Sequence, residues 1–328
     1  MLILTLLLIT GCSLIDDDLS VCGTDYLISY EVKLVTDIQM TIEERLTLEV
    51  EQSMADTLKR WLAPIFSDQA HDLDMNFFSC DGLDELRYHS FEVVDANQKT
   101  YTLYIPMEDY MHLAVVNTSE NDQISIRGGQ HSSTMALEQT DRDTLNSHAT
   151  AIYTARLPMH ITDKDSSQSF DVRLFMISSA VALVVDTMAF TPSDMRVLLS
   201  GTASGFEIRD SVFTFAHPSL IRTEKLGDRC FAVVCLPSAD TVSVAGSPAA
   251  KMRSAENALW QLRAYVTMPD GRVTETLLNV DTPLEAGKLE IIRVNIHDDG
   301  SLQPIQNMHI GATVTLDWKE GGSHDIDV

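Results

Sequence analysis

The residues that could act as a catalytic nucleophile do not stand in the spacing that such catalysis requires. The best candidate is the segment Ser200-Gly-Thr-Ala-Ser-Gly205, in which Gly205 directly follows Ser204 and no glycine lies two residues before it. A nucleophile elbow has the pattern Gly-x-Ser-x-Gly, so we interpret this segment as a flexible loop. HExxH, Walker-type and GxGxxG motifs are also missing from the sequence. We therefore expect no enzymatic activity, no cofactor and no metal site.

Cys12 stands in a motif that predicts covalent modification. Residues 2–10 are almost entirely apolar and lead into Gly11-Cys12. Nine apolar residues cover only about half of a ~30 Å hydrocarbon core, which indicates a signal peptide over 1–11. The end of this segment, Leu8-Ile-Thr-Gly-Cys12, resembles a bacterial lipobox. Cys12 is then the first mature residue, and palmitate-like acyl chains on it would hold the protein to a membrane without a spanning helix.

Two alternatives to this lipoprotein signal stay open at the level of sequence. The apolar segment could be a plain secretory signal followed by Gly-Cys, or a buried N-terminal helix. No Lys or Arg stands before Leu2, although signal peptides begin with a basic region. This leaves open a start codon upstream of Met1.

Acidic residues dominate the chain and begin directly after Cys12. Asp16, Asp17 and Asp18 resemble an acidic export signal that sends lipoproteins of Gram-negative anaerobes to the cell surface, although they also suit a solvated tether over 12–23. The whole chain has 23 basic and 48 acidic residues, a formal charge of −25. Such a surface repels phosphate, which excludes nucleic acid as a partner. We expect a location at the outer membrane, on the cell surface.

Four further cysteines remain in a compartment that permits disulfides. Cys22 and Cys80 could form one, although free buried thiols are equally compatible with the sequence. Cys230 and Cys235 lie five residues apart in a strand-like run. An odd separation points their side chains to opposite faces, so they should not bond to each other.

The N-terminal half, 24–160, predicts a β-rich domain with one amphipathic helix. Alternating residues at 26–35 indicate a half-buried strand. Apolar residues then recur every four positions, and a capping box at Thr41-x-x-Glu44 precedes them; Pro64 should end this helix. The run to Cys80 is interpreted as loop or edge, and the polar stretch 117–149 as a surface excursion. Further strands are expected at 101–105, 112–116 and 151–157.

The C-terminal half, 161–328, predicts strands throughout. It follows a polar linker at 162–168, and Pro269-Asp-Gly271 and Asp298-Asp-Gly300 mark turns. No interleaved helices indicate a parallel sheet, so we expect an antiparallel sandwich. The expected strands cover 170–176, 180–185, 230–236, 260–266, 273–278, 289–296 and 310–318.

Several segments, taken in order, resemble the FimB-type minor fimbrial subunits, which are anchor and accessory lipoproteins of type V pili. They are the lipobox with a second cysteine at Cys22, Tyr101–Asn117, Tyr153–Met159, Val266–Thr276 and Ile310–Gly322. The resemblance runs nearly end to end. It implies two tandem transthyretin-like (Greek-key) β-sandwich domains, no active site, and fimbrial subunits as partners through β-strand addition.

The same resemblance distinguishes an anchor from a polymerising pilin. In that family, pilins mature when a protease cuts at a basic residue in the first domain and removes the lipid and the first strand. Here no Lys or Arg stands between Cys12 and Lys33, and Lys33 falls within the first predicted strand. This pattern favours retention of the lipid.

A rival hypothesis is a glycan-binding surface lipoprotein associated with nutrient uptake. Such a protein needs exposed aromatic rings that stack on sugars. The three tryptophans, Trp61, Trp260 and Trp318, stand in a predicted helix and two predicted strands, where we expect burial.

Overall fold

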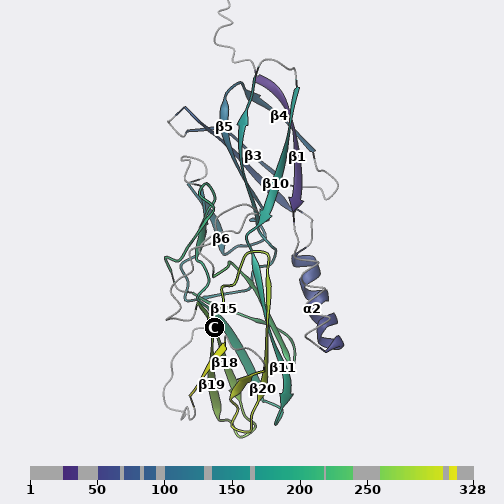
Figure 1. Ribbon diagram of the computed structural model, residues 1–328, viewed down its shortest axis with the longest axis vertical. Coiled ribbons are helices and arrows are strands. Elements are labelled where there is room, and N and C mark those ends of the chain that lie inside the picture. Colours follow the sequence, from purple (N-terminus) through teal and green to yellow (C-terminus); the bar gives the residue numbers. More distant parts are fainter. Residues whose placement is uncertain are drawn as a thin grey trace, which may run out of the picture.

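The structure is a computed structural model, and it describes residues 25–35, 51–66, 70–81, 85–93, 100–128, 135–162, 167–217, 219–238, 259–305 and 310–315. Within these residues the chain forms β1 to β22 in four sheets and one helix, α2. The molecule is elongated, with the sheet containing β1 at one end and the sheets containing β11 and β18 at the other (Figure 1). The prediction of a mostly-β sandwich protein with one helix is confirmed.

The first sheet has seven strands in the order β3-β2-β5-β9-β10-β1-β4. Its strands are β1 (Asp25–Val35), β2 (Asp72–Ser79), β3 (Leu86–Val93), β4 (Thr100–Pro106), β5 (Asp109–Val116), β9 (Tyr153–His160) and β10 (Ser167–Met176). Only two residue pairs join β9 to β10. Beyond this corner the two parts of the sheet face each other, because the Tyr30 ring of β1 lies against the Phe77 ring of β2. The first sheet thus forms a sandwich by itself.

The second sandwich consists of two facing sheets. One contains β11 (Ser179–Met188), β16 (Glu224–Gly227), β17 (Cys230–Cys235), β20 (Leu289–Ile296) and β21 (Leu302–Pro304). The other contains β8 (Thr144–Leu145), β12 (Asp194–Ser200), β15 (Leu220–Arg222), β18 (Trp260–Thr267), β19 (Val273–Val280) and β22 (Ile310–Thr315). Apolar side chains from both sheets form one core between them.

The two sheets of this sandwich differ in their sequence pattern because they differ in burial. Strand β18 alternates buried and half-buried residues along its whole length, as expected for a sheet with one wet face. Strand β17 is buried at every position, and β11 is buried over its first seven. Its even-numbered residues Ala180, Ala182 and Val184 join a second core on the outer face. The continuous apolar run at 180–185 therefore marks a strand that is covered on both faces.

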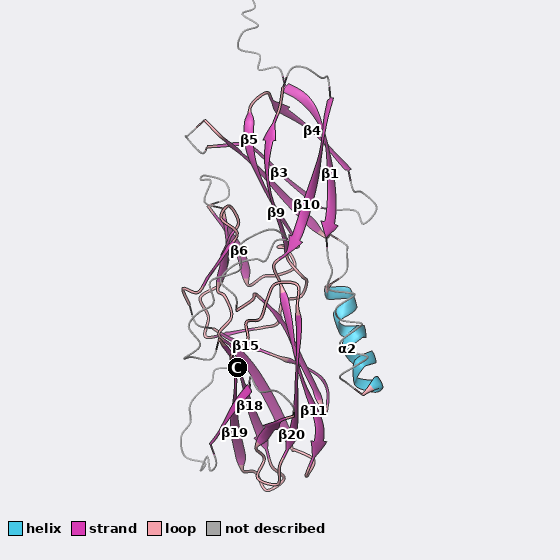
Figure 2. Ribbon diagram, in the orientation of Figure 1, coloured by secondary structure: helices cyan, strands magenta, loops and turns pink. Residues whose placement is uncertain are grey.

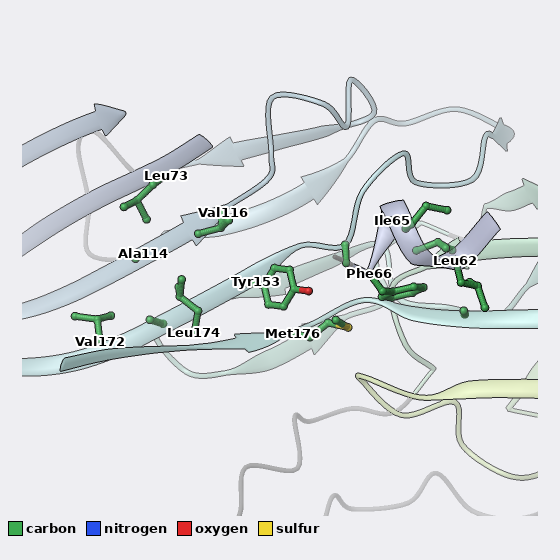
Figure 3. Close-up of a cluster of buried hydrophobic side chains, with 14 of the residues drawn as sticks. Leu62, Ile65, Phe66, Leu73, Ala114, Val116, Tyr153, Val172, Leu174 and Met176 are labelled. Carbon is green, nitrogen blue, oxygen red and sulfur yellow. The ribbon is translucent and has the colours of Figure 1, made fainter. Parts of the chain in front are cut away.

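Helix α2 (Gln52–Ile65) contributes to the core on that outer face. Its buried residues, Met54, Ala55, Leu58, Leu62 and Ile65, recur at helical spacing. The Trp61 indole N–H donates to Glu224 Oε2 at 2.8 Å, which ties the helix to β16. In Figure 2 α2 is the one cyan element and lies beside the strands. Its last turn reaches the first sheet, since Leu62, Ile65 and Phe66 join a cluster with Tyr153 and Met176 (Figure 3).

The helix prediction is correct in part. Pro64 was expected to end the helix, and α2 ends one residue later, where the Phe66 N–H donates to Leu62 O at 2.9 Å. The predicted capping box Thr41-x-x-Glu44 lies outside the described residues.

The interpretation of 117–149 as a surface excursion is wrong. This stretch contributes β6 (Ile124–Arg127), β7 (Ala136–Gln139) and β8. Strands β6 and β7 form a small sheet with β13 (Gly205–Glu207) and β14 (Val212–Thr214), and its side chains cover the outer face of β2 and β5. Buried polar groups explain the misleading composition. Asn121, for example, donates to Asn117 O at 2.8 Å and accepts from the Ala149 N–H at 2.9 Å.

Three further expectations need correction. The run to Cys80 contains β2, a central strand between β3 and β5 rather than a loop or edge. Strand β10 was expected to open the second domain, yet it pairs with β1 in the first sheet. The pairs β1–β10 and β11–β20 are parallel, so the sheets are mixed rather than purely antiparallel. Alternation of apolar and polar residues within a strand indicates which face of the strand is buried, but not which strand it pairs with.

Truncation of the helix's buried face should destabilise the protein. Leu62 is 1% exposed, and we expect Leu62→Ala to lower the free energy of unfolding by about 2–5 kcal/mol. Urea unfolding followed by circular dichroism measures this loss. Arg60→Ala, on the exposed face of α2, is the control and should change stability by less than about 0.5 kcal/mol. Equal effects of the two substitutions would show that α2 is not docked.

Candidate functional site

The position of β1 in the first sheet is the candidate site for strand exchange. Strand β1 pairs in parallel with β10 from Leu27 to Val35 and antiparallel with β4 from Asp25 to Glu31. Both rows of its backbone groups are therefore used. Without β1, the edges of β10 and β4 would be open to another strand.

The inner face of β1 is tied to the opposite half of the sandwich. The Tyr30 hydroxyl is fully buried and hydrogen-bonds to His112 Nε2 on β5. His112 Nδ1 lies 3.1 Å from Asn76 O, so Nδ1–H donates to that carbonyl and Nε2 accepts from Tyr30. Phe77 stands opposite His112 in the β2–β5 register, and their rings stack with centroids 4.2 Å apart. This arrangement fixes one tautomer of a neutral imidazole.

Burial decides the protonation of this pair. Desolvation lowers the pKa of His112 to about 3, although its hydrogen bond with the Asn76 carbonyl acts in the opposite direction. Desolvation also raises the pKa of Tyr30. Both side chains are therefore neutral at physiological pH. The site has the properties of a packed structural contact between β1 and β5.

Lys33 lies within β1, as the sequence predicts. It is in register with Arg173 of β10. The peptide bond after Lys33 thus belongs to a paired strand rather than to an open loop.

The predicted site residues are mostly beyond what the structure describes. Cys12, Asp16, Asp17, Asp18 and Cys22 lie outside the described residues, so lipidation, the export signal and the Cys22–Cys80 disulfide stay predictions. Cys80 is exposed directly after β2, and its N–H donates to Asp109 O at 3.0 Å.

Cys230 and Cys235 are buried on opposite faces of β17, as their odd spacing predicts. Cys230 contributes to the core that includes α2, and Cys235 to the core of the second sandwich. Burial raises the pKa of the Cys230 thiol to about 11 and raises that of Cys235 as well. Neither thiol is poised as a nucleophile.

The segment 200–205 is a packed connection, so its interpretation as a flexible loop is wrong. Ser204 is buried, and its hydroxyl accepts from the Ala216 N–H at 2.9 Å. Gly201 has φ +86°, and a Cβ there would lie 2.7 Å from Leu259 O. Among the described residues, no group of three or more His, Cys, Asp or Glu side chains could hold a metal ion.

Sequence reasoning did not identify His112 as part of the site. A signal was available, because a lone histidine begins the apolar run 112–116 at a position that shares a face with Tyr110 and Ala114. Such a residue needs neutral partners inside the core. The partners, Tyr30 and Asn76, lie on other strands.

The fold is shared with solved structures of a fimbrial anchor protein and of candidate adhesin and polysaccharide-binding proteins from bacteria. The fimbrial anchor protein Mfa2 from Porphyromonas gingivalis has a TM-score of 0.50 and 14% identity, with 88% of this chain and 98% of that chain covered. A candidate polysaccharide-binding protein (DUF1812) from Bacteroides thetaiotaomicron has a TM-score of 0.52 and 10% identity, with coverage of 90% and 99%. A candidate adhesin from Bacteroides ovatus has a TM-score of 0.52 and 10% identity, with coverage of 88% and 95%.

The chain shares their fold. No protein-family model matches the sequence, and no curated protein matches it either. At 10–14% identity, the likeness concerns the architecture of the two sandwiches. No helix in the described part of the chain is both long and apolar enough to cross a membrane.

Acid should destabilise the folded protein through its buried histidines. His112 and His148 have folded pKa values of about 3 and about 4, below the ordinary 6.5. As pH falls below 6.5 the unfolded chain takes up protons that the folded chain does not, so stability present above pH 6.5 is lost. Each histidine should cost up to about 1.4 kcal/mol per pH unit. Urea unfolding at pH 6.5 and pH 4.5 measures the difference.

His112→Gln keeps a neutral amide at this position but removes the titration. We expect a smaller loss of stability between the two pH values in this variant, and a smaller loss still when His148→Gln is added. A loss equal to that of the parent protein in the double variant would contradict the assignment.

The bond after Lys33 should resist a Lys/Arg-specific protease while the protein is folded. A protease must separate β1 from β10 before it can bind the chain at that position, and local opening of a paired core strand is unfavourable. Mass spectrometry of a limited digest should show no product that starts at Leu34. The same digest in urea should cut there. Rapid native cleavage after Lys33 would show that β1 is not stably paired.

Proposed function

We propose that this protein is a lipid-anchored minor fimbrial subunit that anchors a type V pilus or regulates its assembly through β-strand addition. The observation that carries the proposal is the position of β1, paired with β10 and β4 on its two sides. In the family that the sequence resembles, a polymerising pilin loses its first strand. Here the first strand is an integral part of the sheet, with Tyr30 hydrogen-bonded into the opposite half of the sandwich.

The anchoring role rests on Cys12. Acyl chains contribute about 0.8 kcal/mol per buried CH₂, and more than one chain gives stable membrane attachment. With β1 retained, the acylated residue stays covalently joined to both sandwiches. In this proposal the lipid holds the protein at the outer membrane, and the acidic triplet Asp16–Asp18 directs it to the cell surface.

The fold comparison supports a fimbrial role. Mfa2 of Porphyromonas gingivalis is a fimbrial anchor protein, and this chain covers 98% of its length with the same architecture. The proposed partners are accordingly other fimbrial subunits. Their binding mode, addition of a strand to a sheet edge, depends on backbone hydrogen bonds and alternate side chains rather than on reactive groups, which is why the proposal includes no enzymatic activity.

The described tryptophans argue against the glycan-binding alternative. Trp260 is fully buried, and its indole N–H donates to Thr282 O at 2.8 Å. Trp61 is half-buried and hydrogen-bonded to Glu224. Both rings are used in packing, and Trp318 lies outside the described residues.

The proposal predicts a mature membrane protein that begins with acylated Cys12 and retains β1. Mass spectrometry of the protein from isolated membranes should find acyl-Cys12 joined to an intact chain through Val35. Cys12→Ala should release the protein from the membrane. The fibres should then lose their attachment or the control of their length, which electron microscopy measures. Cys80→Ala is the matched control and should leave attachment unchanged.

A mature chain that begins after Lys33 would refute the anchoring role. Fibres of unchanged length and attachment in cells that lack the protein would do the same.

A further inference from the structure

A cleft in the second sandwich lies where the chain passes from β15 in one sheet to β16 in the facing sheet. Strand β15 pairs with β12 only at Leu198 and Leu199. The chain turns at Thr223, whose N–H and hydroxyl both donate to Val197 O, at 3.1 and 2.9 Å. It then continues as β16, which pairs with β17 in the facing sheet.

Within the described part of the chain, the strand switch leaves part of β12 without a neighbour on one side. On one side, β12 pairs with β18 over its whole length. On the other side, no described strand pairs with Asp194–Arg196. We call this stretch the open edge. The N–H and C=O groups of one strand residue point to the same edge of the strand, and those of the next residue point to the opposite edge. The Val197 carbonyl faces β15. The backbone groups of Met195, two residues earlier, therefore point to the same side, where they face the open edge.

The cleft beside the open edge has an apolar floor. Its volume is about 330 Å³. Met195, Val197 and Phe231 line it, and all three belong to the core between the two sheets, with 5%, 2% and 1% exposure. A side chain that enters the cleft from an added strand would therefore contact the sandwich core itself.

The mouth of the cleft is cationic, although the chain has a formal charge of −25. Arg196, Arg222 and Lys225 line it, with Asp194 as the single carboxylate among the lining residues. Arg196 lies over the Tyr265 ring at 5.8 Å and 3.7 Å from Asp194. Lys225 lies 3.4 Å from Asp228, and Arg222 has no ion-pair partner among the described residues.

We propose that the open edge of β12 accepts an extended peptide segment, from a partner protein, in which apolar and acidic residues alternate. Backbone groups of the segment pair with β12 at Met195. Alternate side chains then point to opposite faces. The apolar ones enter the cleft over Met195, Val197 and Phe231, and the acidic ones lie on the outer face beside Arg196 and Arg222.

This inference extends strand addition to a second sheet, and it does not depend on the lipid anchor or on β1. Loss of fibre anchoring would leave peptide binding intact, and absence of peptide binding would leave the anchoring result intact. The two proposals can therefore fail separately.

A six-residue peptide, acetyl-Asp-Ile-Asp-Val-Asp-Ile-amide with a fluorescent label, tests the site by anisotropy on the full-length protein. We expect the double variant Arg196→Glu, Arg222→Glu to weaken binding about tenfold or more, because it replaces two exposed ion pairs with the peptide by two like-charge contacts. Arg156→Glu, exposed on β9, is the control and should bind as the parent does. Circular dichroism establishes that the variants are folded.

Backbone pairing is tested by two N-methylated forms of the same peptide. Only one row of its N–H groups can face β12, so methylation of one alternate set should abolish binding and methylation of the other set should preserve it. Equal binding of both forms would overturn the proposal. So would equal binding of the block peptide Asp-Asp-Asp-Ile-Ile-Val, which keeps the charge but loses the alternation. Absence of peptide binding, or preferential binding of trigalacturonate, would overturn it as well.

Discussion

The backbone hydrogen-bonding groups at strand edges are the constraint on which this structure depends. Each strand has two rows of donors and acceptors, and a row left unpaired in a dry environment is costly. In the first sheet β1 lies between β10 and β4 and pairs with the backbone groups along the facing edge of each strand. Only two residue pairs link β9 and β10. The strand nearest the proposed lipid is thus also the one that completes its half of the sandwich.

The same constraint explains how the two sandwiches are joined. Strands β11 and β17 are buried on both faces over most of their length, so something other than the facing sheet must cover them. Helix α2 does so, and its last residues continue into the core of the first sheet. One cluster of buried side chains therefore extends from Tyr30 to Ala182. A tension applied between the first strand and the second sandwich would act through a continuous core rather than through a bare linker.

Simple hydrophobic patterns in the sequence predicted several of the strands. Alternation located β1, β4, β10 and β18, and continuous apolar runs located β11 and β17. One of the missed strands, β2, has buried polar residues. In β2, Asp72 is 1% exposed and accepts from the N–H groups of Thr118 and Ser119 at 3.1 and 2.9 Å. A composition-based argument treats such a carboxylate as a surface residue, because its partners stand more than 40 positions away.

The sequence also could not predict which strands pair with each other. The alternation in β10 is as regular as in any strand, but the register Tyr30 to Phe170 joins residues 140 positions apart. A parallel pair such as β1–β10 needs a long crossover, and here most of the first sandwich forms it. The hydrogen-bond partner of His112 could not be predicted for the same reason, because Tyr30 lies 82 positions away. The position of the candidate site therefore follows from topology rather than from any local motif.

The high negative charge of the molecule affects its association with other protein chains. Two copies of a chain with charge −25 repel at low ionic strength, but at 0.15 M salt the Debye length is about 8 Å. At that range a partner responds to the local surface rather than to the total charge. An approaching acidic segment meets Arg196, Arg222 and Lys225 together in one cleft. Local cations beside the open edge, which no described strand covers, thus favour the approach of an acidic strand, while the acidic remainder of the surface discourages unspecific edge-to-edge aggregation.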